Sequence, residues 1–315
     1  MATLPIFVTG HQRPDTDSIA SAIALAELRN HQRSPAGQDR YQAVRLGEIS
    51  PQTSWVLKQA KAEPPILYDG IFGDETPQFI LVDHSEVMQS VPNFDQVEIV
   101  EILDHHSVGS VTTKMPIRAL WDPVGATATL VTEEFQRHLI EPTKKTATLL
   151  MAAILADTVI LKSPTTTHRD VVALHYLEDL TGLEGESFGR KMFEVSTDVS
   201  HLSASEIVAG DAKEFRGVGR KFFVAHLIVC DDKLLSQLQE LLEALEAERL
   251  AQGVPFYGLM MTNILTMGTK LLIAGELGVR DAVARAFGKE PASIIELPGV
   301  SSRKLQVVPP LMEVF

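Results

Sequence analysis

Three short apolar runs in the first half of the chain are each followed by acidic residues and histidines, and this pattern constrains the fold more than any other feature. Each run has the length of one buried strand, and patterns with helical spacing lie between and after the runs. The strand-like runs are residues 4–9, 78–82 and 98–103, and the helical patterns are residues 18–30, 127–139 and 143–157. Strands that alternate with helices predict a parallel sheet covered by helices on both faces.

The length of the chain predicts two domains. A single hydrophobic core rarely grows beyond about 250–300 residues, and this chain has 315. We expect a parallel α/β domain over residues 1–188, a linker over residues 189–196, and a smaller mixed α/β domain over residues 197–315. For the second domain we expect a strand at residues 220–229, a charged helix from Lys233 to about Gln252, two apolar segments at residues 256–265 and 269–277, a short helix near residues 281–287, and a last strand near residues 305–309.

The composition argues against several classes of protein. The hydrophobic fraction is 45% and the charged fraction 22%, which are ordinary values for a globular protein, and no run of about 18 apolar residues predicts a membrane-spanning helix. The formal charge of −13 argues against binding to nucleic acid, which needs a basic face. The first residues lack the basic start of a secretory signal, and the single Cys230 excludes an internal disulfide. We therefore expect a cytoplasmic protein.

The residues that follow the apolar runs are of the types that bind divalent metal ions. Carboxyl ends of parallel strands meet at one edge of a sheet, where ligands of open α/β sheets bind. Asp157 at the end of a helical pattern opposes the helix dipole, and a nearby cation would offset that cost. As an alternative, Asp17 or Ser18 is an ordinary helix N-cap in a polar loop. The candidate residues are His11, Asp15, Asp17, Asp83, His84, Asp104, His105, His106 and Asp157.

The chemistry of this set predicts two metal ions. Imidazole among the ligands favours Mn²⁺, Co²⁺ or Zn²⁺ over Mg²⁺, which prefers oxygen and water. Two ions about 3.5–4 Å apart suit in-line attack on phosphorus, because they generate a hydroxide and stabilise the developing charge. His106 follows His105 directly, and successive side chains of an extended segment point to opposite sides. One imidazole can therefore bind metal while the other faces a substrate.

Six segments, in their order along the chain, closely resemble family II inorganic pyrophosphatases of the DHH phosphoesterase superfamily. LDHH alone marks the wider superfamily, whereas SSRK near the carboxyl end is more discriminating. The segments are GHQRPDTDSIASAIA, ILVDHSE, EILDHH, AILADTVILKSPT, DAKEF and SSRKLQVVP. The resemblance implies hydrolysis of pyrophosphate by two Mn²⁺ ions, for which Co²⁺ can substitute, with an additional Mg²⁺ that accompanies the substrate. It also suggests a homodimer.

The resemblance implies roles for individual residues. His11, Asp15 and Asp83 correspond to ligands of one ion, and Asp17, Asp83, His105 and Asp157 to ligands of the second, so that Asp83 bridges the two. His106 corresponds to the catalytic residue at the leaving phosphate. Lys213, Arg303 and Lys304 correspond to the residues of the second domain that bind the phosphate oxygens, which places the active site in the cleft between the domains.

Two positions depart from the family pattern, and two other functions remain as alternatives. Arg13 stands where relatives often carry Asn, and Leu305 where a third basic residue often follows Arg-Lys. One alternative is another DHH phosphoesterase that acts on oligonucleotides, cyclic dinucleotides or polyphosphate. Such nucleotide-cleaving relatives commonly carry a GGH-type motif, and this chain has no Gly-Gly pair. The other alternative is a catalytically silent regulator, against which the full set of ligands argues.

Overall fold

The computed structural model describes residues 4–33, 40–70, 76–275 and 277–315. The chain divides into two compact units, Met1–Ser196 (unit 1) and Thr197–Phe315 (unit 2). Among the described helices, none is both long and apolar enough to span a bilayer.

Unit 1 is built on a parallel sheet whose described strands have the order β3-β2-β1-β4-β5-β6. The predicted parallel α/β class is confirmed, since every neighbouring pair in this sheet is parallel. The chain builds the sheet outwards from β1, first on one side and then on the other, so the strand order reverses between β1 and β4. Crevices at such a reversal hold ligands in open α/β sheets. The strands are β1 (Ile6–Thr9), β2 (Tyr41–Arg45), β3 (Ile66–Leu67), β4 (Gln78–Val82), β5 (Glu98–Asp104) and β6 (Arg118–Trp121).

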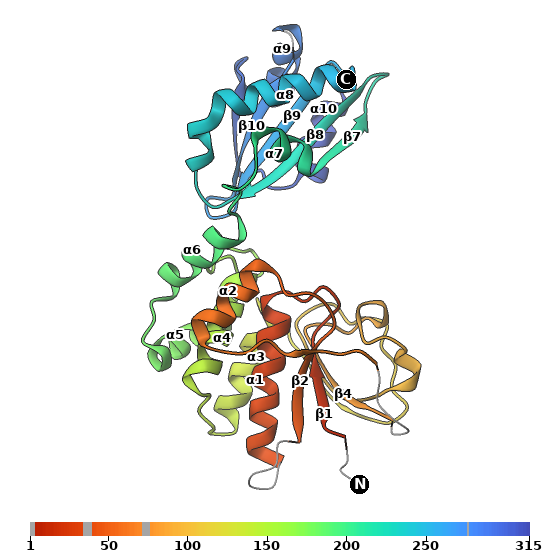
Figure 1. The fold of residues 1–315 in the computed structure, drawn as a ribbon, viewed down its shortest axis with the longest axis vertical. Helices are drawn as coiled ribbons and strands as arrows, with labels where there is room; N and C mark the ends of the chain where they lie inside the picture. Colours follow the sequence, from red (N-terminus) through yellow and green to blue (C-terminus); the bar gives the residue numbers. More distant parts are fainter. Residues whose placement is uncertain (1–3, 34–39, 71–75, 276) are drawn as a thin grey trace. The chain divides into compact units, whose positions relative to one another are not determined.

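Six α-helices accompany this sheet in the described part of unit 1, and most of them gather on one side of it (Figure 1). The core helix α4 is apolar on nearly all sides, because α1, α2, α3, α5 and α6 all pack around it. Thr143 caps its start, and Gly182 ends α5 in the left-handed conformation that glycine adopts readily. The helices are α1 (Thr16–Arg33), α2 (Pro51–Ala60), α3 (Thr127–Arg137), α4 (Lys144–Asp157), α5 (His168–Thr181) and α6 (Gly185–Ser196).

The second face of the sheet differs from the prediction of helices on both faces. Phe7, Phe79 and Leu81 of this face pack against side chains of the segments that lead into β5 and β6. The connection from β4 to β5 contains the short 3-10 helices Val87–Gln89 and Phe94–Gln96. Short 3-10 turns and loops with apolar side chains therefore cover this face, where an α-helix was expected.

A network of buried charges joins the sheet to the helices of unit 1. Arg29 of α1 forms a two-pronged ion pair with Glu101 of β5, with distances of 3.0 and 2.6 Å, and also reaches Glu134 of α3 at 3.3 Å. Arg118 of β6 contacts both glutamates. Because Arg29 and Glu101 are almost completely buried, each needs the opposite charge to offset the loss of hydration.

Residues 189–196, predicted as a linker, are helical and belong to unit 1. They form most of α6, whose strongly amphipathic sequence buries Phe188, Met192 and Phe193. The helix packs against α2 and α4. The sequence of this segment has an apolar face with helical spacing, which the prediction did not recognise. The boundary between the two compact units falls between residues 196 and 197.

Unit 2 contains a mixed sheet with the strand order β11-β10-β9-β8-β7. Strands β8 and β9 are parallel and the other neighbours are antiparallel. The predicted mixed α/β class is therefore confirmed for this unit. Its strands are β7 (Ala212–Arg216), β8 (Lys221–Val229), β9 (Tyr257–Asn263), β10 (Gly268–Ala274) and β11 (Ile294–Pro298).

Helices cover both faces of this second sheet. One apolar core forms between the sheet and helices α7 (Ala204–Gly210) and α8 (Leu238–Gln252), and a second forms on the face of α9 (Leu277–Ala286) and α10 (Val308–Met312). A 3-10 helix at Lys233–Gln237 precedes α8. The last predicted strand, near residues 305–309, is wrong. This segment is a π-helical turn, Arg303–Val307, that continues into α10 and buries Val307, Val308 and Leu311.

Candidate metal centre

The six residues of unit 1 that the resemblance implies as metal ligands lie together near the carboxyl ends of β1, β4 and β5, where the strand order reverses. Three groups of ligand atoms share Asp83, and within each group the atoms lie within 4.8 Å of one another. One group joins Asp83 and His105 to His106, and the other two consist of the implied ligands. We call these two the His11 cluster (His11, Asp15, Asp83) and the His105 cluster (Asp17, Asp83, His105, Asp157). These groups coincide with the two sets that the resemblance implied.

The loop after β1 places His11 and Asp15 in the His11 cluster. His11 Nε2 lies 3.5 Å from a carboxylate oxygen of Asp15 and 3.5 Å from one of Asp83. Asp15 also accepts a hydrogen bond from the backbone N–H of Ser18 at 2.9 Å, so it caps the start of α1. Gly10 permits the close packing of this loop, since a Cβ there would lie 2.5 Å from the Cβ of Ser18. The alternative that Asp17 or Ser18 is the N-cap of this helix is wrong.

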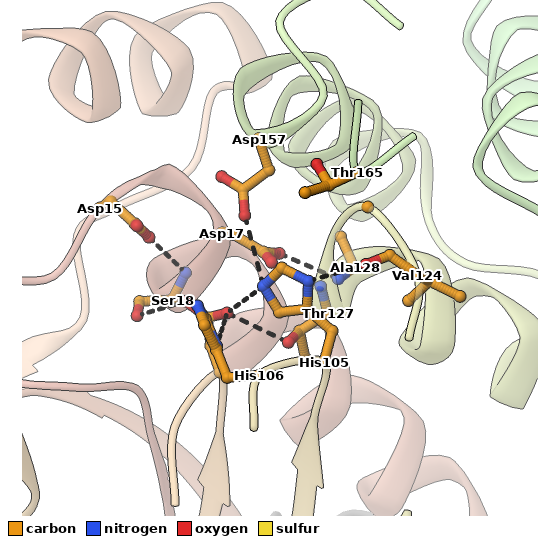
Figure 2. A network of polar contacts seen from close by, with 12 residues as sticks. Asp15, Asp17, Ser18, His105, His106, Val124, Thr127, Ala128, Asp157 and Thr165 are labelled. Carbon is orange, nitrogen blue, oxygen red and sulfur yellow. Dashed lines mark hydrogen bonds and ion pairs between the residues drawn. The ribbon is translucent and has the colours of Figure 1, made fainter. Parts of the chain in front are cut away.

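Asp17 points from the first turn of α1 to the start of a different helix. Its carboxylate accepts the backbone N–H groups of Thr127 and Ala128, at 2.6 and 2.9 Å, and the hydroxyl of Ser21 at 3.0 Å. Thr127 and Ala128 begin α3, whose positive dipole end favours the ionised carboxylate. A carboxylate has about four acceptor positions, so Asp17 keeps capacity for a further partner. Figure 2 shows Asp17 beside His105 and Asp157.

Asp83 is the residue common to both clusters, and its backbone is strained. It follows β4 with φ of 63°, a left-handed conformation uncommon for any residue except glycine. The hydroxyls of Ser18 and Thr127 donate to its two oxygens at 2.9 and 3.1 Å. Strain of this kind persists where surrounding contacts hold it, and it often marks a functional residue.

His105 and Asp157 complete the second cluster (Figure 2). The Nε2 atom of His105 lies 3.5 Å from Asp83 and 3.7 Å from Asp157, the last residue of α4. Its Nδ1 atom donates to the carbonyl oxygen of Val124 at 2.9 Å. Directly after Asp157 the chain turns through three consecutive left-handed residues, Val159 to Leu161, and so leaves the helix end abruptly.

His106 differs from His105 in its surroundings. Its ring is half-exposed, and Nδ1 lies 3.0 Å from Asp104 and 3.9 Å from Asp83. The hydrogen bond to Asp104 raises the pKa of His106, burial lowers it, and the charge of Asp83 adds to the increase. The expectation that the two neighbouring histidines point to opposite sides is wrong, because their ring centroids lie 4.2 Å apart and both rings approach Asp83. The two rings differ in burial, since that of His105 is mostly buried. The positioning partner, Asp104, had no assigned role in the sequence prediction, although it is the first residue of DHH.

The carboxylates of the centre strongly affect one another. Burial raises the pKa of Asp17 well above its usual range, and the charges of Asp83, Asp157 and Asp15 raise it further. Burial, Asp83 and Asp15 likewise raise the pKa of Asp157. Burial lowers the pKa of His11, but hydrogen bonds with Asp15 and Asp83 outweigh it and bring the pKa to about 11. Positive charge among these carboxylates would therefore be stabilising.

The donor atoms fit divalent metal ions. Nδ1 of His11 donates to the carbonyl oxygen of Gln12, and Nδ1 of His105 to that of Val124, so the neutral rings carry their lone pairs on Nε2. Nε2 of His105 is buried without a hydrogen-bond partner among the described residues. The Nε2 lone pair of neutral His105 faces carboxylate oxygens of Asp83 and Asp157 and repels them unless a cation binds. Mixed nitrogen and oxygen ligands suit Mn²⁺ and similar ions.

The three candidate phosphate-binding residues belong to unit 2. Lys213 lies on β7 with its side chain mostly exposed, and Arg303 begins the π-helical turn with its side chain largely buried. Lys304 follows Arg303 and is exposed. Lys213 and Arg303 both approach Asp211, with Nζ of Lys213 at 3.9 Å and Nη2 of Arg303 at 3.1 Å. The sequence prediction gave Asp211 no role, although it is the first residue of DAKEF.

Both halves of the chain match families of known proteins. Residues 5–154 match the DHH family, N-terminal domain, and residues 190–314 match the DHHA2 domain. A manganese-dependent inorganic pyrophosphatase of Methanothrix thermoacetophila is 37% identical, with 98% of each chain covered. A probable manganese-dependent inorganic pyrophosphatase of Bacillus licheniformis is 36% identical, also with 98% of each chain covered.

Two solved structures resemble the chain along most of its length. A putative family II inorganic pyrophosphatase from Methanococcus jannaschii is 34% identical, with a TM-score of 0.60 and 97% of each chain covered. An exopolyphosphatase-related protein from Bacteroides fragilis is only 13% identical, with a TM-score of 0.51 and 98% of this chain and 90% of that chain covered. The second likeness extends to the fold alone.

Proposed function

Because the chain belongs to the family of manganese-dependent inorganic pyrophosphatases, we propose that the His11 and His105 clusters hold the metal ions of its reaction. This reaction is the hydrolysis of pyrophosphate to two phosphates, and the chain has the DHH and DHHA2 domains. The observation that carries the proposal is the position of Asp83. It belongs to both clusters at the point where the strand order of the sheet reverses. One shared carboxylate can hold two ions side by side.

The proposal assigns one Mn²⁺ to His11, Asp15 and Asp83 and a second to Asp17, Asp83, His105 and Asp157. Co²⁺ substitutes for Mn²⁺ in the same sites, since both accept imidazole and carboxylate ligands. When bound, such a pair of ions supplies an activated water and neutralises charge on the phosphate that is attacked. A Mg²⁺ ion accompanies the substrate in this proposal.

His106 is the proposed catalytic residue. Asp104 holds its Nδ1 atom at 3.0 Å, so its Nε2 atom is the one available for proton transfer or hydrogen bonding at the leaving phosphate. Its half-exposed ring can reach a substrate, whereas the ring of His105 is mostly buried. This difference supports a substrate role for His106 and a ligand role for His105.

Lys213, Arg303 and Lys304 are the proposed phosphate-binding residues. Arginine offers a planar pair of N–H donors that matches two phosphate oxygens, and lysine adds a compact charge. Because the proposed metal ligands belong to unit 1 and these cations to unit 2, the proposal requires both units to reach one substrate. We propose that unit 2 closes over pyrophosphate. Small-angle scattering with a non-hydrolysable analogue should then show compaction, and unchanged dimensions would contradict closure.

The decisive experiment measures phosphate release from pyrophosphate by the metal-stripped protein after addition of Mn²⁺, Co²⁺ or Mg²⁺. A short oligonucleotide and a polyphosphate serve as parallel substrates. We expect rapid release from pyrophosphate, strongest with Mn²⁺ or Co²⁺, and about two ions per chain by metal analysis. Cleavage of the oligonucleotide or polyphosphate in the absence of pyrophosphate hydrolysis would overturn the assignment of the phosphate-binding residues.

Two further properties stay predictions. The family resemblance suggests a homodimer formed through unit 1, which sedimentation of the Mn²⁺-loaded protein would test. The single cysteine is compatible with a reducing, cytoplasmic compartment.

A further inference from the structure

Asp211 contacts Arg303 with both its main chain and its side chain. The carbonyl oxygen of Asp211 accepts a hydrogen bond from Nη1 of Arg303 at 2.5 Å, and its carboxylate lies 3.1 Å from Nη2. Nη1 also donates to the carbonyl oxygen of Val224 on β8 at 3.1 Å. The side chain of Arg303 is only 10% exposed, whereas that of Asp211 is 50% exposed. A largely buried guanidinium is thus held at one edge by a single aspartate and its neighbouring strand.

These contacts leave a defined part of the Arg303 guanidinium for other partners. The group has five N–H donors, of which two belong to Nη1, two to Nη2 and one to Nε. Both Nη1 donors and one Nη2 donor bind Asp211 and Val224. Within the described part of the chain, Nε and the remaining Nη2 donor have no protein acceptor. Two such donors on one guanidinium match two oxygens of a phosphate.

Asp211 also lies beside the second cation of this surface. Lys213 is the second residue of β7, and its Nζ atom lies 3.9 Å from the carboxylate of Asp211. Two positive groups that converge on one anion repel each other in its absence, and a carboxylate between them offsets that repulsion. Asp211 therefore approaches two of the three proposed phosphate-binding cations, Lys213 and Arg303.

The backbone of Asp211 is itself held in place. It ends α7 and immediately precedes β7, and its carbonyl oxygen also accepts the backbone N–H of His226 on β8 at 3.2 Å. Strand β7 pairs with β8, which sets Lys213 opposite Val224, the residue whose carbonyl binds Arg303. The positions of the two cations thus depend on the same two strands and on one acidic side chain.

We propose that Asp211 is a positioning residue for pyrophosphate binding, which holds Arg303 and Lys213 in the arrangement that receives the phosphate oxygens. This inference rests on the proposed function of unit 2. The carboxylate fixes one edge of the guanidinium, so the free donors point in a set direction before substrate arrives. Pre-ordered donors lose less side-chain entropy on binding.

The test compares steady-state kinetics of Asp211→Asn, Asp211→Glu and the wild-type enzyme, all loaded with Mn²⁺. Asn removes the charge, and we expect KM for pyrophosphate to rise about tenfold while kcat changes by less than about threefold, as for loss of uniform binding. Glu keeps the charge and should recover part of the affinity. Asp232→Asn is the matched control, because Asp232 pairs with Lys270 in the same unit at 2.7 Å, away from Arg303. It should leave KM unchanged.

A double-mutant cycle with Arg303→Lys separates positioning from a general loss of structure. If Asp211 acts through Arg303, Asp211→Asn should raise KM much less in the Arg303→Lys background than in the wild type. If Asp211→Asn raises KM by the same factor in the wild-type and Arg303→Lys backgrounds, the two residues act independently and the proposal is overturned. An unchanged or lower KM for Asp211→Asn alone would also overturn it. Thermal unfolding of each variant identifies any that are misfolded. Failure of the proposed function is distinguishable, because the wild-type enzyme would then release no phosphate from pyrophosphate.

Discussion

The carboxylate of Asp17, in the first turn of α1, accepts the backbone N–H of Thr127 at the start of α3 at 2.6 Å, across 110 positions of sequence. The same carboxylate belongs to the His105 cluster. The start of one helix therefore fixes the orientation of a proposed ligand on another helix. Because Thr127 also donates its hydroxyl to Asp83, the start of α3 supports two ligands together.

Asp17→Asn should lose the ion of the His105 cluster. The variant keeps the size of the side chain but removes the charge that binds metal. We expect about one Mn²⁺ per chain, against an expected two for the wild type. The rate of hydrolysis should fall by more than the ~10–100-fold typical of a change in a residue that only supports a ligand. Metal analysis after dialysis and a phosphate-release assay provide the measurements. Asp179→Asn, at an exposed position on α5, is the control. Two retained ions in Asp17→Asn would refute the ligand role.

Thr127→Val should weaken metal binding while the fold is kept. Valine has nearly the same shape but lacks the hydroxyl that orients Asp83 at 3.1 Å. Loss of an outer-shell hydrogen bond typically costs about 10–100-fold in metal affinity, and we expect a change in this range for Mn²⁺. Titration of the metal-stripped protein gives the affinity. Thr148→Val removes a buried hydroxyl of α4 that bonds to the carbonyl of Lys144, at the opposite end of this helix from Asp157, and should leave the affinity unaltered.

His106→Gln and Asp83→Ala should separate catalysis from metal binding. Loss of a proton-transfer group typically costs about 10²–10⁴-fold in rate, so His106→Gln should reduce kcat by this order with its metal content nearly unchanged. Asp83→Ala removes the shared ligand and should lose both activity and metal. Rate and metal content are measured on the same preparations. Equal loss of metal in the two variants would contradict the different roles assigned to them.

Glu101→Gln should destabilise unit 1 strongly. The substitution removes the charge of Glu101, so that the buried Arg29 keeps only its ion pair with Glu134. Removal of one partner of a buried ion pair costs about 3–5 kcal/mol of stability. Both tryptophans of the chain, Trp55 and Trp121, belong to unit 1, so their fluorescence in urea follows this unit alone. Glu186→Gln, in an exposed ion pair on α6, should leave the unfolding midpoint unchanged.

The effect of Glu101→Gln should also depend on pH. Burial raises the pKa of Glu101, but the ion pairs with Arg29 and Arg118 outweigh this and lower it below the ordinary 4.5. A carboxyl group with a lowered folded pKa stabilises the protein above its unfolded pKa, and this contribution is lost as pH falls through the folded pKa. The difference in unfolding free energy between wild type and variant should therefore be constant near neutral pH and shrink below pH 4.5. A difference that stays constant down to pH 3, well below the ordinary pKa of 4.5, would argue against the ion pair as its source.

Local patterns predicted the elements that carry the proposed ligands. Strand-like runs before His11, Asp83 and His105 and the helix that ends at Asp157 are all present, because short apolar runs and helical spacing are properties of neighbouring residues. The segments without such patterns were missed or wrong. Strand β6 is half-exposed and lacks a continuous apolar run, and the π-helical turn at Arg303 was taken for a strand.

The amino-acid sequence by itself determined the class of each domain and the residue types available for metal binding, since both depend on spacing along the chain. Only the tertiary structure decided which of these groups come together. Asp17 meets Thr127, and Asp211 meets Arg303, because helices and strands distant in sequence pack against one another. Contacts of this kind arise from the burial of whole faces of helices and sheets, and no short segment contains the information that defines them.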